Sequence, residues 1–435
     1  MKIHLTSEHP ADLVGLPGRA PLLSWMVSQA EPGLTQLEAE IEVSPFADFR
    51  TGPGKTVLVG PHSQFIPTPF ASLESRDVRF FRARIRTEAG WTAWSNTVRH
   101  EVGLLKANDF VGFAIGDESA PTAAPALLRK VFSIEKPISS ARLYATAHGT
   151  FDLMLNGKRV GDEVLSPGWT PYAERLLVVA HDVTELLQPG ANAWGVLLAD
   201  GWYRGKFGFT NETANYGSQT AFLGQLEVKF TDGTSQIIAT DSSWSTDTGA
   251  VRFASIYDGA DFDFNFVQPG WCTPDFDASD WRKAIIHPMD KSTLEPRSAA
   301  PVRVIQEFEP VLSEHEGNIR VDLGQNIAGW LRIKLRATAG SKLVARHAEV
   351  VEPNNDLHTA ALRFARATDS WIFSEDGEFT VEPKQTFHGF QYADLIVEKG
   401  SVEVLEVTGL AISSDLTIRG EIETSHSGIN KLVSN

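Results

Sequence analysis

The sequence predicts an all-β protein with three β-sandwich domains in series and a short helical segment at its C-terminal end. Two observations lead to this prediction. Apolar and polar residues alternate, with the period of a strand that has one buried face, at 81–86, 262–266 and 331–336. The 35 glycines and 23 prolines punctuate these short segments, and no apolar stripe with helical spacing extends over about 12 residues before position 416.

The length and the charge of the chain narrow the classes of partner. At about 150 residues per domain, 435 residues correspond to about three domains. With 39 basic and 55 acidic residues, the formal net charge is −16, which disfavours nucleic acid or an anionic membrane as a partner. Cys272 is the only cysteine, which excludes an intrachain disulfide and a thiolate metal cage. The N-terminal sequence lacks the apolar core of a signal peptide, so we expect a cytoplasmic protein.

The first predicted domain spans residues 1–104. It contains an early Trp25, the long alternating segment at 78–86, and the pair Trp94-Ser95 before the last strand. About a hundred residues of short strands around a buried tryptophan are typical of a small β-sandwich. We expect this domain to be fibronectin-type-III-like.

The second predicted domain spans residues 105–298. One of its strands runs into Asn156-Gly157, a pair suited to the positive φ angles of a type I′ hairpin turn. The strand at 193–198 leads into the segment Asp-Gly-Trp-Tyr-Arg-Gly at 200–205, and Tyr-Asp-Gly at 257–259 precedes a further strand. This domain therefore places acidic and aromatic residues together at strand ends.

The third predicted domain spans residues 299–416, and the remaining residues, 417–435, change character. Ser427 is suited to a helix N-cap position. Ile429, Leu432 and Val433 follow it with the i, i+3, i+4 spacing of an amphipathic helix. We expect these last residues to begin a helical domain that the chain does not complete.

Acidic and aromatic residues around Asp200, Trp202 and Asp258 form the first candidate site. Calcium takes six to eight oxygen ligands, which carboxylates and backbone carbonyls of loops can supply. A tryptophan beside such an ion offers an apolar face to a sugar ring. The alternative is structural: Asp200 belongs to a turn, and Asp261 and Asp263 lie on a solvated strand face.

His347, Glu349 and His388 form the second candidate. His347 and Glu349 lie two residues apart on a predicted strand and so share a face. The set lacks a third clustered ligand and the His-Glu-x-x-His helix of many zinc sites, so we expect the segment around His388 to pack in the core. Motifs for a serine nucleophile, a phosphate loop or a dinucleotide site do not occur, and spacing alone nominates no pair of glycosidase carboxylates.

These motifs resemble the N-terminal half of bacterial α-L-rhamnosidases, glycoside hydrolase family 78. The resemblance covers nearly the whole chain and keeps the order of the family's motifs, which are LNGKRVGDEVLSPGWTPYAERL (155–176), DVTELLQPGANAWGVLLADGWYRG (182–205), IYDGADFD (256–263), GWCTPDFDASDW (270–281), VDLGQNIAGW (321–330), RHAEVVE (346–352), FHGFQY (387–392) and GEIETSHSGINKL (420–432). It implies a jelly roll in the second domain, another β-sandwich in the third, and a catalytic (α/α)6 barrel that begins near residue 417. The two catalytic glutamates of this inverting family lie in the barrel. The resemblance therefore assigns no catalytic residue to this chain and implies that the chain alone is inactive.

The resemblance also implies a ligand for the second domain. In some members of the family this jelly roll binds L-rhamnose with the help of calcium. Carried onto this chain, the cation ligands are Asp200 and Asp258, and the sugar contacts are Asn156 and Trp202.

The chain departs from the family pattern at three positions. Gly201 offers no side-chain ligand, Ala260 stands where Glu is usual, and Gln391 stands where Arg is common.

Two other functions stay open, a stand-alone carbohydrate-binding module and a fragment of a glycosidase of the β-galactosidase or β-glucuronidase type. The expected partners are L-rhamnose-containing glycosides and, in a complete enzyme, the barrel. Apolar surface left uncovered on the third domain and the tail predicts self-association, for example as a homodimer.

Overall fold

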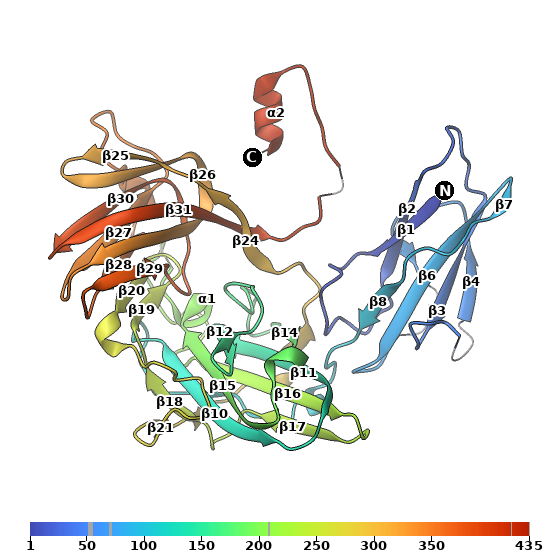
Figure 1. Cartoon of the computed structure of the whole chain (residues 1–435), viewed down its shortest axis with the longest axis horizontal. Coiled ribbons are helices and arrows are strands. Elements are labelled where there is room, and N and C mark those ends of the chain that lie inside the picture. The colour runs from blue at the N-terminus through green and yellow to red at the C-terminus, as the bar shows by residue number, and fades with distance from the viewer. Residues whose placement is uncertain (51–54, 69–71, 208, 419, 435) are drawn as a thin grey trace.

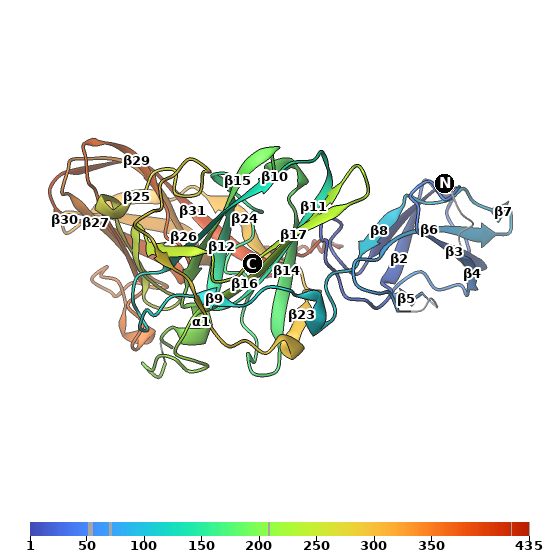
Figure 2. The same ribbon diagram turned by 90° about the horizontal axis from the view of Figure 1, so that it is seen from below.

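Three β units follow one another along the chain, and a short helix stands at its C-terminal end (Figure 1). The computed structural model describes residues 1–50, 55–68, 72–207, 209–418 and 420–434. The second and third units lie against each other, and the first unit lies at the far side of the second (Figures 1 and 2). None of the helices in these ranges is long and apolar enough to cross a membrane.

The first unit is a sandwich of two sheets with the orders β1-β2-β5 and β4-β3-β6-β7, in which β8 also pairs with β6. Its strands are β1 (Lys2–Ser7), β2 (Leu22–Ser28), β3 (Glu38–Ser44), β4 (Lys55–Val59), β5 (Ile66–Pro67), β6 (Val78–Thr87), β7 (Gly90–Trp91) and β8 (Val98–Glu101). Trp25 is buried between the two sheets with Ile41 and Phe81.

The outer face of the first unit explains the alternation in its sequence. Every second residue of β6 is buried, while Arg82, Arg84 and Arg86 point outward. Each arginine stands directly opposite an acidic residue of β3 and forms an ion pair with it, which gives the pairs Arg82–Glu42, Arg84–Glu40 and Arg86–Glu38. Opposite charges across a strand pair stabilise its register. The sandwich is confirmed, and its assignment to the fibronectin type III class stays a prediction.

The second unit is a jelly-roll sandwich of two sheets, ordered β13-β12-β15-β10-β18-β21 and β22-β9-β16-β11-β14-β23, in which β17 also pairs with β16. Its strands are β9 (Ile115–Gly116), β10 (Ala126–Ile134), β11 (Ile138–His148), β12 (Thr150–Leu155), β13 (Lys158–Arg159), β14 (Leu176–Asp182), β15 (Gly190–Ala199), β16 (Ala221–Phe230), β17 (Ser235–Ala239), β18 (Ser245–Thr248), β21 (Arg282–Lys283), β22 (Ile285–Ile286) and β23 (Leu294–Pro296). Trp194 and Trp244 meet edge to face in its core, with ring centroids 5.0 Å apart. The one-turn helix α1 (Gly201–Arg204) follows β15.

The third unit is a ten-stranded sheet with the order β19-β20-β28-β27-β30-β26-β31-β24, in which β25 and β29 pair with β26. Its strands are β19 (Val251–Ser255), β20 (Gly259–Asp263), β24 (Val302–Phe308), β25 (Val311–His315), β26 (Asn318–Ala337), β27 (Lys342–Ala348), β28 (Thr368–Ile372), β29 (Gly377–Val381), β30 (His388–Lys399) and β31 (Val402–Ser414). The long strand β26 pairs near its start with β25 and β30 and near its end with β29 and β31, so it connects the two halves of the unit.

Two strands of this third sheet come from within the sequence range of the second unit. β19 and β20 follow β18 along the chain, yet β20 pairs in parallel with β28, with Phe262 opposite Trp371. The chain then returns to the jelly roll at β21 and β22. The second and third units are therefore joined by strand pairing as well as by side-chain packing.

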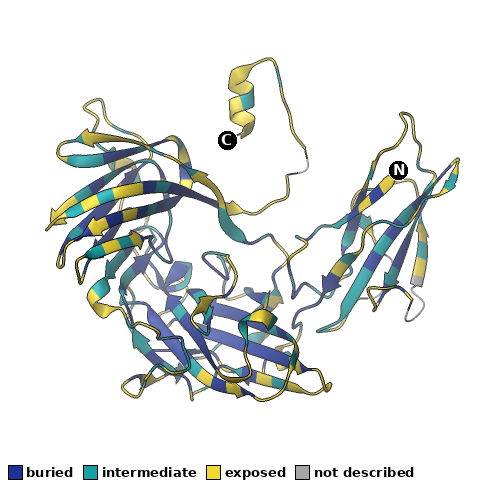
Figure 3. Cartoon of the chain, viewed as in Figure 1, coloured by how far each residue is buried: buried dark blue, intermediate teal, exposed yellow. Residues whose placement is uncertain are grey.

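The C-terminal segment ends in the helix α2 (Ser427–Ser434), none of whose residues is buried. Figure 3 shows this helix and the chain before it as exposed, above the space between the first and third units. The apolar side chains exposed in this tail are Leu416, Ile418, Ile422, Ile429, Leu432 and Val433. The expected uncovered apolar surface is present in the tail, and self-association through it stays a prediction.

The buried ion pair between Glu163 and Arg297 gives a test of how the second unit is held together. Both oxygens of Glu163 accept from Arg297, at 2.5 and 2.6 Å, and both side chains are buried. The substitution Glu163→Ala leaves a buried guanidinium without its counter-charge, which costs about 3–5 kcal/mol. Chemical unfolding followed by tryptophan fluorescence measures this loss. The matched control is Glu295→Ala, which removes the partner of Arg175 in an exposed pair and is expected to cost about 0–1 kcal/mol. Equal costs for the two variants would contradict the expectation.

Candidate functional site

The two loops singled out in the sequence meet in the structure. The chain leaves β15 at Asp200 and turns into α1, where Gly201 has a φ angle of 53°. A Cβ atom at this glycine would lie 2.6 Å from Cγ2 of Thr150, so both the space and the backbone angle require glycine. Beyond α1, the Nζ atom of Lys206 lies 2.9 Å from Oδ1 of Asp258 in the second loop. The Asp-Gly-Trp and Tyr-Asp-Gly motifs therefore border one site.

Asp200 is tied to groups of this chain on both of its oxygens. Its side chain is 4% exposed. Oδ1 accepts from Nε and Nη2 of Arg204 at 2.7 and 2.6 Å, and Oδ2 accepts from the backbone amide of Thr122 at 2.9 Å. Burial raises the pKa of Asp200, and the charge of Arg204 acts against this rise. Asp200 therefore connects α1 to the start of the jelly roll.

Asp258 is likewise buried and paired. Its Oδ1 accepts from Nζ of Lys206 and from the backbone amide of Arg366 at 3.0 Å, and the Arg366 side chain donates to the Asp258 carbonyl. A calcium ion takes six to eight oxygen ligands, several of them carboxylates, and a lysine or arginine bonded to a carboxylate competes with the ion for it. Among the described residues, neither Asp200 nor Asp258 belongs to a group of carboxylates and histidines close enough to hold an ion. The side chains at these positions therefore do not fit the calcium site that the resemblance implies.

Trp202 lies between an aromatic surface and the core. Its ring stacks on Trp169 with the ring planes 6° apart and the centroids separated by 5.9 Å. It also packs against a buried cluster at the contact between the second and third units, which includes Leu165, Ile256 and Trp330. Trp202 therefore holds Trp169 in place and is itself only partly accessible.

Trp169 is the most accessible member of an aromatic surface over these loops. Its side chain is 48% exposed, and its Nε1 donates to the hydroxyl of Tyr216 at 3.0 Å. Phe207 packs against Trp169, Tyr216 and Tyr257 with centroid separations of 5.6, 6.3 and 6.1 Å. We call Trp169, Trp202, Phe207, Tyr216 and Tyr257 the aromatic surface, although Phe207 is itself buried and supports the others.

A cavity of about 520 Å³ adjoins the aromatic surface at Tyr216 and is lined also by His148, Tyr172 and Tyr203. The imidazole of His148 stacks on Tyr203 with the ring centroids 4.4 Å apart. Burial lowers the pKa of His148 to about 4, so the ring is neutral at pH 7. The cavity therefore offers aromatic faces and a neutral imidazole, together with the ionised carboxylate of Asp290, and such a mixture suits a ligand that carries hydroxyl groups.

Asn156 lies at a hairpin turn and uses its side chain to hold that turn. Its backbone has a φ angle of 50°, as the Asn-Gly pattern predicts. Its Nδ2 donates to the Leu186 carbonyl and to Oδ1 of Asn192, and its Oδ1 accepts from the amide of Ala193. Both ends of the amide therefore serve the fold, and the proposed sugar contact of Asn156 stays a prediction without support from this geometry.

The histidines of the second candidate come together in the core of the third unit, and Glu349 does not join them. The ring centroids of His347 and His388 lie 4.1 Å apart, and Nε2 of His388 lies 3.0 Å from Oδ2 of the buried Asp369. Glu349 instead accepts from Asn326. Because His388 and Phe390 are buried, the expectation that this segment packs in the core is confirmed.

Sequence reasoning found Trp202 and missed the residues that surround it. The cations Arg204 and Lys206 lie four and six residues after Asp200, and Trp169 reaches the site from another loop. One signal was available: four of the six tyrosines in the chain, at 172, 203, 216 and 257, fall within one stretch of the sequence. All four lie at the aromatic surface or its cavity.

Comparisons with protein families match three consecutive parts of the chain. Residues 3–106 match the Rha78A-like N-terminal immunoglobulin domain, residues 136–306 the alpha-L-rhamnosidase N-terminal domain, and residues 313–413 the bacterial alpha-L-rhamnosidase concanavalin-like domain. All three matches are to domains of rhamnosidases. They give no support to the alternative of a fragment of a β-galactosidase-type or β-glucuronidase-type glycosidase.

Whole proteins of similar sequence and structure carry the same description. An alpha-L-rhamnosidase of Alteromonas sp. (strain LOR) is 33% identical over 396 residues, which are 86% of this chain and 43% of that protein. The structure of the Aspergillus terreus enzyme superposes with a TM-score of 0.91 and 32% identity over 99% of this chain and 51% of that one. The Streptomyces avermitilis enzyme complexed with L-rhamnose superposes with a TM-score of 0.92 and 24% identity over 100% of this chain and 60% of that one. The chain thus spans about half the length of these relatives.

Calcium is expected to leave the thermal stability of the protein unchanged, because Arg204 and Lys206 already neutralise the two carboxylates. An ion that bound only the folded state would raise the unfolding temperature with its concentration. Thermal unfolding in EDTA and in excess calcium chloride measures this, with magnesium chloride as the control. A rise specific to calcium that the substitution Asp258→Asn abolishes would contradict the expectation.

The buried His347 predicts a loss of stability in mild acid. Burial, followed by the charge of His388, lowers the pKa of His347 to about 3, against about 6.5 in the unfolded chain. Between these two pKa values the unfolded state binds more protons than the folded state. As the pH falls, this histidine therefore lowers the free energy of unfolding by up to about 1.4 kcal/mol per pH unit. Urea unfolding at several pH values from about 4 to about 6, which lie between the two pKa values, measures the slope. The variant His347→Gln should show a shallower slope than the wild type, and identical slopes would contradict this account.

Proposed function

Because the chain belongs to the α-L-rhamnosidase family through three consecutive non-catalytic N-terminal domains, we propose that it is the carbohydrate-binding and supporting part of such an enzyme. The complete enzyme would hydrolyse terminal α-L-rhamnose with inversion. The described residues form three β units and short helices, and no (α/α)6 barrel lies among them. The part described would therefore bind and position glycosides rather than cleave them.

The aromatic surface is the observation that supports sugar binding. A pyranose presents a face of C–H groups that packs on an aromatic ring, while its hydroxyls need hydrogen-bonding groups at the edge. Trp169 supplies a half-exposed ring, one that stacks on Trp202. Tyr216, which is 40% exposed, and the neutral His148 supply polar groups nearby.

The chemistry of this surface favours an uncharged sugar bound without a cation. Its two carboxylates, Asp200 and Asp258, are each paired with a cation of this chain, so they add no net charge for an ionic ligand. L-rhamnose is such a sugar, and the Streptomyces avermitilis relative is complexed with it. We therefore propose L-rhamnose units of larger glycosides as the ligand, recognised through ring stacking.

Removal of the exposed ring is expected to weaken this binding. The substitution Trp169→Ala should reduce the affinity for methyl α-L-rhamnoside by about fivefold or more, since an aromatic contact is worth about 1 kcal/mol beyond its buried area. Isothermal titration calorimetry measures the change, and unfolding temperature checks that the variant is folded.

The matched control is Trp91→Ala in the first unit, whose indole is also partly exposed but lies on another domain. This control should bind as the wild type does. Unchanged affinity in Trp169→Ala, or an equal loss in both variants, would contradict the proposed role of the aromatic surface.

A further inference from the structure

The third unit reaches the aromatic surface through residues 364–368, which we call the latch segment. These residues end the connection from β27 to β28 and lie against the Tyr-Asp-Gly motif at the turn from β19 to β20. The amide of Ala367 donates to the carbonyl of Tyr257 at 3.2 Å, and the amide of Thr368 donates to the carbonyl of Asp258 at 3.0 Å. The loop that carries Tyr257 of the aromatic surface is therefore bonded through its backbone to the latch segment.

The glycine of the Tyr-Asp-Gly motif is required by this contact. Gly259 has a φ angle of 104°, in the region that residues with a side chain rarely adopt. A Cβ atom at this position would lie 2.1 Å from the carbonyl oxygen of Thr368. The motif thus has a structural cause within this chain, because its glycine admits the latch segment at close range.

Lys206 connects the latch segment to the second unit. Its Nζ donates to Oδ1 of Asp258 at 2.9 Å and to the carbonyl of Phe364 at 2.8 Å. The side chains of Lys206 and Asp258 are 16% and 11% exposed, so little water competes for this bond. Hydrogen bonds between charged groups are stronger than neutral ones, the more so where water is excluded. One ammonium group therefore joins a loop of the jelly roll to two segments of the third sheet.

The rings of the aromatic surface are joined across the same two loops. Phe207 and Tyr257 pack edge to face with their ring centroids 6.1 Å apart, and Phe207 also packs against Trp169 at 5.6 Å. Lys206 directly precedes Phe207, and Asp258 directly follows Tyr257. The ion pair and the aromatic pair are thus neighbours along both loops. The position of the exposed Trp169 ring therefore depends on the bonds of Lys206.

The backbone at the latch segment is strained. Arg363, which directly precedes it, has φ and ψ angles of 56° and −109°, and Ala367 within it has a φ angle of 46°. Non-glycine residues in such conformations cost energy and persist only where surrounding contacts hold them. The contacts that hold this segment include those to Lys206 and Asp258. Loss of the Lys206 bonds therefore favours release of the segment, which relieves the strain.

We propose that Lys206 is a positioning residue that couples the aromatic surface to the latch segment, so that sugar binding and attachment of this segment favour each other. The sugar in this coupling rests on the proposed function, whereas the attachment of the segment by Lys206 does not. Coupling between two sites is reciprocal. A ligand that holds the rings in place also holds the latch segment, and release of the segment weakens binding of the ligand. The third unit thereby regulates the affinity of the aromatic surface.

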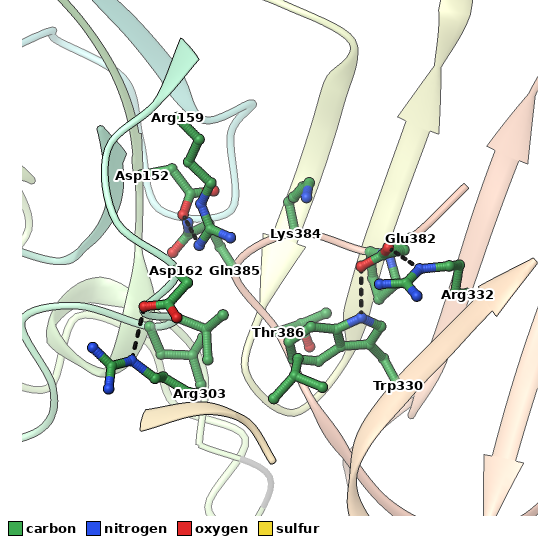
Figure 4. A pocket seen from close by; sticks show the side chains of 14 residues that line it. Asp152, Arg159, Asp162, Arg303, Trp330, Arg332, Glu382, Lys384, Gln385 and Thr386 are labelled. Atoms are coloured by element: carbon green, nitrogen blue, oxygen red, sulfur yellow. Dashed lines mark hydrogen bonds and ion pairs between the residues drawn. The ribbon is translucent and has the colours of Figure 1, made fainter. Parts of the chain in front are cut away.

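A second polar contact between the two units supplies a matched control. Figure 4 shows Asp162 of the second unit bonded to Nε of Arg303 of the third, at 2.8 Å. The described residues that line the pocket at this contact include none of the aromatic surface or of the latch segment. The variant Asp162→Asn therefore removes an ion pair between the same two units and leaves the bonds of Lys206 in place.

Cleavage by trypsin measures attachment of the latch segment without any sugar. Arg363 and Arg366 are exposed, and cleavage of a folded loop follows the population of its opened form when opening is fast relative to cleavage. Lys206→Met should speed cleavage after Arg363 by about tenfold, a factor that corresponds to about 1.4 kcal/mol and is typical of a hydrogen bond to a charged group. Lys206→Arg, which keeps the charge and the donors, should restore slow cleavage.

Mass spectrometry of the fragments follows the rate at this one bond, and Asp162→Asn should be cleaved as the wild type is. Equal rates in Lys206→Met and the wild type would overturn the role of Lys206 in holding the segment. Faster cleavage in Asp162→Asn, equal to that in Lys206→Met, would overturn it as well, because the effect would then belong to any bond between the units.

The indole signal of Trp169 tests the positioning of the ring. In protein labelled with ¹⁵N at tryptophan, this signal is assigned from its loss in Trp169→Phe. It should shift in Lys206→Met without sugar and stay in place in Asp162→Asn, whereas a mere loss of stability leaves the shifts of the folded state unchanged. The signal of the buried Trp25 in the first unit shows that each variant is folded. An unchanged Trp169 signal in folded Lys206→Met would overturn the positioning role.

Titration with methyl α-L-rhamnoside tests the coupling. The sugar should slow cleavage of the wild type after Arg363, and calorimetry should show about tenfold weaker binding to Lys206→Met, with Lys206→Arg close to the wild type. A wild type that binds the sugar but is cleaved equally fast with and without it would overturn the coupling and leave the proposed function standing. A wild type that binds no sugar would overturn the proposed function, while cleavage and the Trp169 signal without sugar would still decide the role of Lys206.

Discussion

The arrangement of the second and third units depends on the segment 251–263, which leaves the jelly roll and enters the neighbouring sheet as β19 and β20. Parallel pairing of β20 with β28 joins the backbones, and side chains fix the crossing on both sides. The amide of Ala260 donates to the buried Asp369, and Arg366 donates to Asp261. Thr386 donates to the carbonyl of Ser255 at the end of β19. Tyr257 of the aromatic surface closely follows this strand, so the aromatic surface borders the connection between the two units.

An acidic chain that folds in this way has to neutralise its buried carboxylates, and here arginine and lysine of the same chain do so. Asp200 is paired with Arg204, Asp258 with Lys206, and Glu163 with Arg297. Such pairs leave the excess of acidic residues on the surface, where water solvates them. They also decide the chemistry of the candidate site, because a carboxylate that is held by an arginine positions a loop instead of binding a metal ion.

The strand content and the order of the domains could be predicted from the sequence, because they depend on local alternation and on motifs read in order. The outward arginines of β6 and the Asn156 turn are examples in which local pattern and structure agree. The ion pair of Asp258 with Lys206 could not be predicted in the same way. Lys206 lies 52 residues earlier in the chain (258 − 206), and no local periodicity relates residues so far apart. The transfer of β19 and β20 into the third sheet is equally non-local.

The aromatic surface shares its apolar support with the contact between the second and third units. Trp202, which stacks on Trp169, packs in the same buried cluster as Leu165 and Trp330. Packed interiors transmit displacement because they have little free volume. A change in the position of Trp330 is therefore resisted by the side chains that hold Trp202, so the packing of this cluster sets how well the aromatic surface is formed before a sugar binds.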